Sequence, residues 1–230
     1  FKPRYLSPRP SRTTLQIPIQ GIGDWCHPTT TFSVNDEALR KADTLHTTLG
    51  VPFLTPKSGC NVIFTTLWDN FPSKCIVPLE GKAERIYLMM AGSTNAMQSR
   101  IENAVVRIVY TDDTADTLSL VNPDTWLAIE QDYYNDGNAF RLEGERPYRL
   151  HLMSGTISKT LSADIRRIKS EEHSIDSNST AISDNVIEGG AATLYDLPLN
   201  SRKRLKCLHV ETLSNDIVVG LLGVTLQRPK

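Results

Sequence analysis

Two stretches of the chain combine aromatic rings with amide and carboxylate side chains, a combination that can bind a sugar. The first stretch is Trp68-Asp69-Asn70, at the end of an apolar run. The second is longer and contains Trp126, Gln131, Asp132, Tyr133 and Tyr134. An aromatic ring stacks on the C–H face of a sugar, while amides and carboxylates hydrogen-bond its hydroxyl edge. These side chains are therefore the candidate carbohydrate-binding residues.

Each stretch also has a purely structural interpretation. Trp68 could belong to the core, with Asp69 and Asn70 forming the turn that follows it. Trp126 could instead close one end of the folded domain. Because neighbouring side chains of an extended segment point to opposite sides, only one of Tyr133 and Tyr134 would face inward, which leaves the other exposed.

The second stretch also contains acids that could form a catalytic pair: Glu130, Asp132, Asp136 and Glu143. Hydrolysis of a glycosidic bond needs two carboxylates, about 5–5.5 Å apart for retention and about 6.5–9.5 Å apart for inversion of configuration. An aromatic neighbour could exclude water from one acid and raise its pKa. Acids near tyrosines in a loop are more often solvated turn residues, so the favoured interpretation is a chain without its own catalytic site.

The same acidic side chains could hold a structural Ca²⁺ through their oxygen atoms. The sequence has no DxDxDG spacing of the kind found in calcium-binding loops, and it has no HExxH, GxSxG or glycine-rich phosphate loop. We therefore expect no cofactor and no metal, with a structural calcium as the open alternative.

Length, composition and charge limit the classes of partner. The chain has 230 residues, of which 40% are hydrophobic and 22% charged, which is enough to bury a core. Its 25 basic and 26 acidic side chains give a formal charge of −1, so there is no electrostatic basis for binding nucleic acid. The apolar run at 217–224 is too short to span a membrane. Because the chain does not begin with Met, we expect a mature form or a fragment of a longer protein.

Strands must position most of these residues. Residues 86–91 form an apolar run typical of a strand buried on both faces, and 105–111 alternate before a turn and a return strand at 117–121. Residues 35–50 are the clearest helical candidate, with Asn35 or Asp36 as the cap. Further strands are expected at 13–19, 29–34, 61–68, 74–79, 148–153, 191–199, 205–211 and 217–227.

About ten strands with short turns and no alternation of strand and helix predict an all-β fold. The expected architecture is an antiparallel β-sandwich of jelly-roll type with at most one or two short helices. Residues 1–12, basic and proline-rich, are expected to form a linker or arm. Residues 13–230 would form a single domain, with an insertion around 156–187 that lacks an apolar pattern.

The four cysteines are Cys26, Cys60, Cys75 and Cys207. None belongs to a CxxC pair, and no histidine lies at the spacing of a zinc site. The favoured interpretation is four unpaired thiols. A single disulfide between Cys60 and Cys75 stays open for an oxidising compartment.

Longer motifs carry a resemblance to a known family. They are WDNFP (68–72), IYLMMAGSTNAMQSRIEN (86–103), NPDTW…IEQDYY (122–134), EGGAATLYDLPL (188–199) and SNDIVVGLLGVTLQR (214–228). They resemble the jelly-roll-like C-terminal region of a Bacteroidetes family of secreted, glycoside-hydrolase-like proteins, whose domains are largely of unknown function. The resemblance covers most of the chain from Gly21 onward, apart from 156–186. It implies a periplasmic or extracellular β-sandwich in polysaccharide degradation, with an attached catalytic domain upstream, and it supplies no catalytic residues.

Three hypotheses for function follow. The favoured one is a non-catalytic module that binds a polysaccharide or oligosaccharide, or supports an attached glycoside hydrolase domain. A purely structural interdomain module is the second, and it predicts buried aromatics and an exposed apolar patch. A small glycoside hydrolase is the third, and it predicts two carboxylates that face each other across a pocket.

Overall fold

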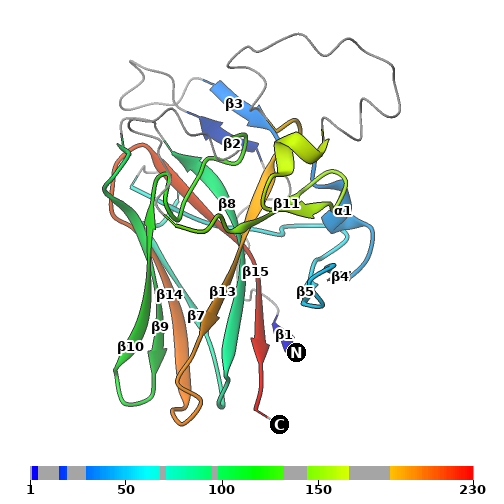
Figure 1. Cartoon of the computed structure of the whole chain (residues 1–230). Coiled ribbons are helices and arrows are strands. Elements are labelled where there is room, and N and C mark those ends of the chain that lie inside the picture. The colour runs from blue at the N-terminus through cyan, green and yellow to red at the C-terminus, as the bar shows by residue number, and fades with distance from the viewer. Residues whose placement is uncertain are drawn as a thin grey trace, which may run out of the picture.

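The structure, a computed structural model, describes residues 2–4, 16–19, 30–67, 71–94, 98–131, 144–165 and 187–229. Strands dominate, and they form two antiparallel sheets that pack face to face (Figure 1). The described residues contain two short helices, α1 (Glu37–Arg40) and 161–165. The predicted all-β sandwich is therefore confirmed.

The large sheet has seven strands in the order β1-β15-β8-β13-β11-β12, with β6 also paired to β15. Its strands are β1 (Lys2–Arg4), β6 (Ile63–Thr66), β8 (Arg85–Thr94), β11 (Tyr148–His151), β12 (Ile157–Ser158), β13 (Ala191–Pro198) and β15 (Ile217–Gln227). The small sheet has the order β10-β9-β14-β7, formed by β7 (Lys74–Pro78), β9 (Glu102–Tyr110), β10 (Ala115–Val121) and β14 (Leu205–Thr212). Two hairpins are separate from these sheets: β2 (Gln16–Ile19) with β3 (Thr30–Ser33), and β4 (Thr44–His46) with β5 (Pro52–Leu54).

The strand pairing is nested, as in a jelly roll. The pairs are β6 with β15, β7 with β14, β8 with β13, and β9 with β10, all antiparallel. This is the pattern of one long hairpin wrapped around a common core, so that its two arms alternate between the two sheets.

Because the arms alternate between sheets, the connections gather at two opposite ends of the sandwich. At one end, the amide of Thr212 donates to Ser73, that of Leu213 to Asn103, and that of Arg100 to Asn122. We call this the loop end; its described connecting residues are 67, 71–73, 98–101, 122–131 and 213–216. At the opposite, turn end the connections 79–84, 111–114 and 199–204 are short (bottom of Figure 1).

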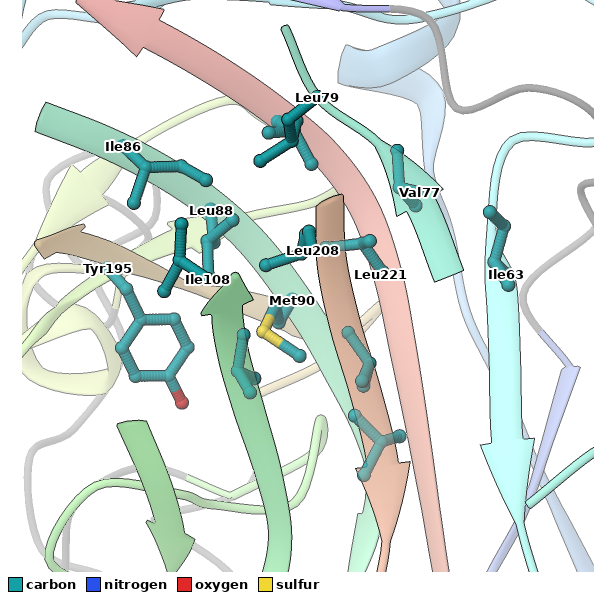
Figure 2. Packing of buried hydrophobic residues seen from close by; sticks show 14 of the residues in the cluster. Ile63, Val77, Leu79, Ile86, Leu88, Met90, Ile108, Tyr195, Leu208 and Leu221 are labelled. Atoms are coloured by element: carbon teal, nitrogen blue, oxygen red, sulfur yellow. The ribbon is translucent and has the colours of Figure 1, made fainter. Parts of the chain in front are cut away.

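Alternation along the strands explains the core between the sheets. Leu88 and Met90 of β8 face Ile108 of β9 and Leu208 of β14, and all four are fully or almost fully buried (Figure 2). Side chains on the other face of β8 join a second cluster, which includes Leu39 of α1 and covers the outer face of the large sheet. The prediction that 86–91 is a strand buried on both faces is therefore confirmed, because two cores enclose it.

The helix predicted for 35–50 is wrong beyond Arg40. After α1, the chain forms the hairpin of β4 and β5. Its turn is closed by Thr47, whose hydroxyl donates to the Val51 carbonyl at 2.7 Å and accepts from the Val51 amide at 3.1 Å. Threonines compete for backbone hydrogen bonds in this way and lose side-chain entropy in a helix, so they favour the hairpin here.

Three other expectations meet the structure in part. Lys2–Arg4, expected in a linker or arm, pair with β15 as β1. The expected insertion contributes β12 and the helix at 161–165, and its remainder at 166–186 lies outside the described residues. Cys60 and Cys75 are free thiols, so the open Cys60–Cys75 disulfide is not formed; Cys26 lies outside the described residues.

Candidate functional site

The two sugar-type stretches both adjoin the loop end. Trp68, Asp69 and Asn70 lie outside the described residues, but they directly follow Leu67, next to the pairing of Thr66 with Val218. Asp132, Tyr133 and Tyr134 also lie outside the described residues. They follow a segment at 126–131 that is bound to the end of β8, since the Ile129 amide donates to the Gly92 carbonyl at 2.8 Å. The fold therefore brings together the flanks of two stretches that are about 60 residues apart in sequence.

Trp126 is part of the core and offers no free face to a sugar. Its side chain is fully buried and belongs to the cluster between the sheets. Its backbone amide donates to the Val121 carbonyl at 3.1 Å, and the Tyr195 hydroxyl fixes the preceding residue by donating to the Thr125 carbonyl at 2.6 Å. This corrects the prediction that Trp126 is a stacking platform: the ring closes one end of the sandwich.

Among the candidate carbohydrate-binding residues, Gln131 is the one whose side chain is both described and exposed. Its backbone carbonyl accepts a hydrogen bond of 2.9 Å from Nη1 of Arg149. The side chain therefore projects from an anchored backbone, directly before the stretch that contains Tyr133 and Tyr134. An amide held in this way can donate to and accept from sugar hydroxyls.

Arg149 of β11 is the anchor, and the sequence analysis missed it. The guanidinium is fully buried, and its Nη2 donates to the carbonyls of Ala128 at 3.2 Å and Ala191 at 3.1 Å. It thereby ties the 128–131 turn to β13 and holds the backbone at Gln131. The available signal was a single arginine inside a short apolar strand, since a buried cation needs several acceptors.

His151, on the same strand, has a structural role. Its Nε2 lies 2.8 Å from the Glu188 carbonyl oxygen, which can only accept, so Nε2 carries the proton. Its Nδ1 lies 2.8 Å from the Ser154 hydroxyl. With both ring nitrogens engaged, His151 connects β11 to the segment that precedes β13.

Glu130 is the one acid of the candidate catalytic set that the structure describes. Burial raises the pKa of Glu130 above its usual value, and the nearby charge of Arg149 opposes that rise. The Oε2 atom is buried and makes no hydrogen bond. The other candidates, Asp132, Asp136 and Glu143, lie outside the described residues, so no pair of facing carboxylates stands among those described.

The raised pKa of Glu130 leads to a prediction about pH. Both the folded and the unfolded chain hold this proton well below pH 4.5, so ionisation of Glu130 has no effect on stability there. As the pH rises from 4.5 through the raised pKa that Glu130 has in the folded chain, the unfolded chain ionises first. The free energy of unfolding therefore falls over this pH range. Glu130→Gln is therefore expected to stabilise the domain at neutral pH and to change little in acid. Urea unfolding at about pH 4 and about pH 7.5 measures the difference.

Glu80→Gln, at an exposed carboxylate, is the matched control and should give no pH-dependent difference. A Glu130→Gln variant that is destabilised at neutral pH would mean that ionised Glu130 is stabilised by its surroundings.

Three aliphatic side chains are exposed at the loop end, each on a different connection. Leu67 is 42% exposed, Ile101 48% and Leu213 41%. We call these three residues the aliphatic rim. Singly exposed leucines and isoleucines are common on protein surfaces, and these three lie on three connections of the same end. Composition and periodicity gave no signal for them, because exposure depends on how the loops pack.

The turn end is chemically different, because ion pairs close it. Lys203 lies 2.8 Å from Asp112, and Lys206 lies 2.6 Å from Asp113. The Tyr110 hydroxyl donates to Asp116, and burial raises the pKa of Tyr110 to about 12. The charges of Lys203, Lys206, Asp112 and Asp113 are thus paired within the chain, whereas both candidate stretches adjoin the loop end.

Metal and membrane candidates are not found in the described parts of the chain. No group of three or more His, Cys, Asp or Glu side chains in these parts could hold a metal ion. In the same ranges, no helix is long and apolar enough to cross a membrane.

The chain matches no protein-family model, no curated protein and no solved structure.

Proposed function

We propose that the chain is a non-catalytic β-sandwich module of a carbohydrate-active protein and that it binds a polysaccharide or oligosaccharide at its loop end. One observation carries this proposal: the two stretches that combine aromatic, amide and acidic residues both adjoin the same end of the jelly roll. Residues from separate connections can then contact successive sugars of one glycan chain.

The buried Trp126 narrows the set of rings that could stack on a sugar. The remaining aromatic candidates are Trp68, Tyr133 and Tyr134, and Gln131 is the described polar candidate beside them. In this proposal, Arg149 holds the backbone at Gln131 while the rings bind sugar faces. The resemblance to the Bacteroidetes family supplies the proposed cellular location and the proposed neighbouring domain. The chain would belong to a periplasmic or extracellular protein with an attached glycoside hydrolase domain upstream.

A second candidate function is a purely structural interdomain module. The burial of Trp126 and the exposed aliphatic rim favour it, since both were expected of such a module. Exposed leucine and isoleucine side chains gain more by contact with a protein surface than with a hydroxyl-rich sugar.

Affinity electrophoresis against a panel of plant and host polysaccharides tests the proposal. We expect at least one glycan to retard the chain, and Trp68→Ala or Tyr134→Ala to reduce its affinity about tenfold, or about 1.4 kcal/mol. Tyr148→Ala is the matched control, because Tyr148 is an exposed tyrosine of β11 outside the candidate set, and it should leave retardation unchanged.

Absence of retardation on every glycan by the folded chain would contradict glycan binding. The structural-module alternative would then be tested through Leu67→Asp and Leu213→Asp, which should weaken binding to the upstream catalytic domain if the aliphatic rim is the interdomain contact.

A further inference from the structure

The outer face of the small sheet is only partly buried: Arg107, His209 and Glu211 are half-buried there, while Val105 and Cys207 are buried. The large sheet differs, because α1, β5 and neighbouring residues bury its outer face. One solvent-facing side is ordinary for an antiparallel sheet, and it then usually carries polar side chains. Here the edge strand β7 contributes Ile76, which at 52% is the most exposed of the large hydrophobic side chains among the described residues.

The centre of this face carries one ion pair in a defined register. Arg107 of β9 lies beside His209 of β14, and Val105 lies beside Glu211. These four residues form a rectangle, with Arg107 and Glu211 at diagonal corners. Nη1 of Arg107 lies 2.7 Å from Oε2 of Glu211, and the two side chains are 39% and 36% exposed. Both charges therefore keep an open side.

We propose that this face is a self-association surface and that its occupant is a second copy of the chain. In a symmetric dimer, the same sheet of two identical copies packs face to face, and a two-fold axis that lies in the interface relates the two copies. When that axis bisects the line from Arg107 to Glu211, each arginine meets the other copy's glutamate. The pair is thus complementary to itself, and the four charges form a closed network across the interface.

The same axis brings apolar surface together. It runs roughly along the other diagonal of the rectangle, from Val105 to His209. Ile76 of β7 lies beside His209 of β14. With about 4.8 Å between strands and about 3.4 Å between residues, the axis extended beyond His209 passes close to Ile76. Ile76 of one copy then meets Ile76 of the other at the axis, and both side chains are removed from water.

The size of the face determines the expected strength of association. Four strands span about 15 Å, and the outer face is about 20 Å long, so each copy buries roughly 300 Å². A stable complex buries about 800 Å² per partner, so the association is expected to be weak, with a Kd of about 0.1–1 mM.

Sedimentation equilibrium of the whole chain from about 10 μM to about 1 mM measures this association. The apparent mass of the parent chain should rise from the monomer value of 25.7 kDa toward twice that value. Arg107→Glu gives each copy two glutamates at the diagonal corners, and Glu211→Arg gives two arginines. Each variant alone should remain monomeric, and an equimolar mixture of the two should recover association, because opposite charges face each other again.

Ile76→Glu should also abolish association, whereas Arg202→Glu, at an exposed arginine of the turn end, should leave it unchanged. A parent chain that stays monomeric throughout the range would overturn the proposal. So would Arg107→Glu chains that associate like the parent, because association would then use another surface. Recovery in the mixture also shows that both variants are folded.

Discussion

Gly92→Ala is expected to cost more than about 4 kcal/mol of folding free energy, or to prevent folding altogether. A Cβ atom at this position would lie 1.9 Å from the carbonyl oxygen of Val218 and 2.9 Å from Cζ2 of Trp126. The Val218 oxygen belongs to β15, the strand paired along the whole length of β8, so it cannot yield without breaking that pairing. Urea unfolding, with soluble expression as a first indicator, measures the effect.

Gly59→Ala is the matched control for this prediction. Gly59 has a φ of +76°, and no atom lies within 4 Å of an added Cβ. Its replacement therefore adds backbone strain alone, with an expected cost of about 1–2 kcal/mol. Equal costs at the two glycines would show that β8 and β15 do not approach as closely at Gly92 as described.

Trp126→Ala is expected to lose about 3–5 kcal/mol of stability, because it removes a fully buried ring from the core between the sheets. Trp126→Phe should lose much less, about 1–2 kcal/mol, because an aromatic ring still fills most of the space. The indole N–H makes no hydrogen bond, so replacement by phenylalanine removes no hydrogen bond. Urea unfolding of both variants measures the difference.

The pair of variants also separates a core role from a binding role. If Trp126 only fills the core, Trp126→Phe should bind glycans as the parent does. A Trp126→Ala chain with unchanged stability but lost glycan binding would restore Trp126 as a stacking residue.

Periodicity predicted the strands whose environment is simple. The apolar run at 86–91, the alternation at 105–111 and the run at 217–227 correspond to β8, β9 and β15. The failure at 35–50 has a local cause: the spacing of Ala38 and Leu39 matched a helix, but the closure of a turn by Thr47 and Val51 was stronger than that weak signal. Short strands such as β1 and β12 depend on a neighbour's edge, which periodicity does not detect.

The candidate site was predictable in composition but not in placement. Trp126 and Gln131 had the same kind of surroundings in sequence, yet one is fully buried and the other exposed, because only the fold decides which residue faces the core. The role of Arg149 could not be predicted, because it depends on where three carbonyl groups of the 128–131 turn lie. The spacing of residues in the sequence does not indicate those positions. The meeting of two distant stretches at one end follows from the nested pairing, and a residue pattern carries no record of which strands pair.

The nested pairing also affects how the chain is made. Ile63 of β6 pairs with Leu221 of β15, so an early strand must wait for one that leaves the ribosome about 160 residues later. At about 5–20 residues per second, that wait lasts roughly 8–30 s. During this time the apolar faces of β6 and β8 lack the strand that lies between them in the finished sheet. The nascent chain should therefore depend on chaperones more than a domain built from local hairpins does.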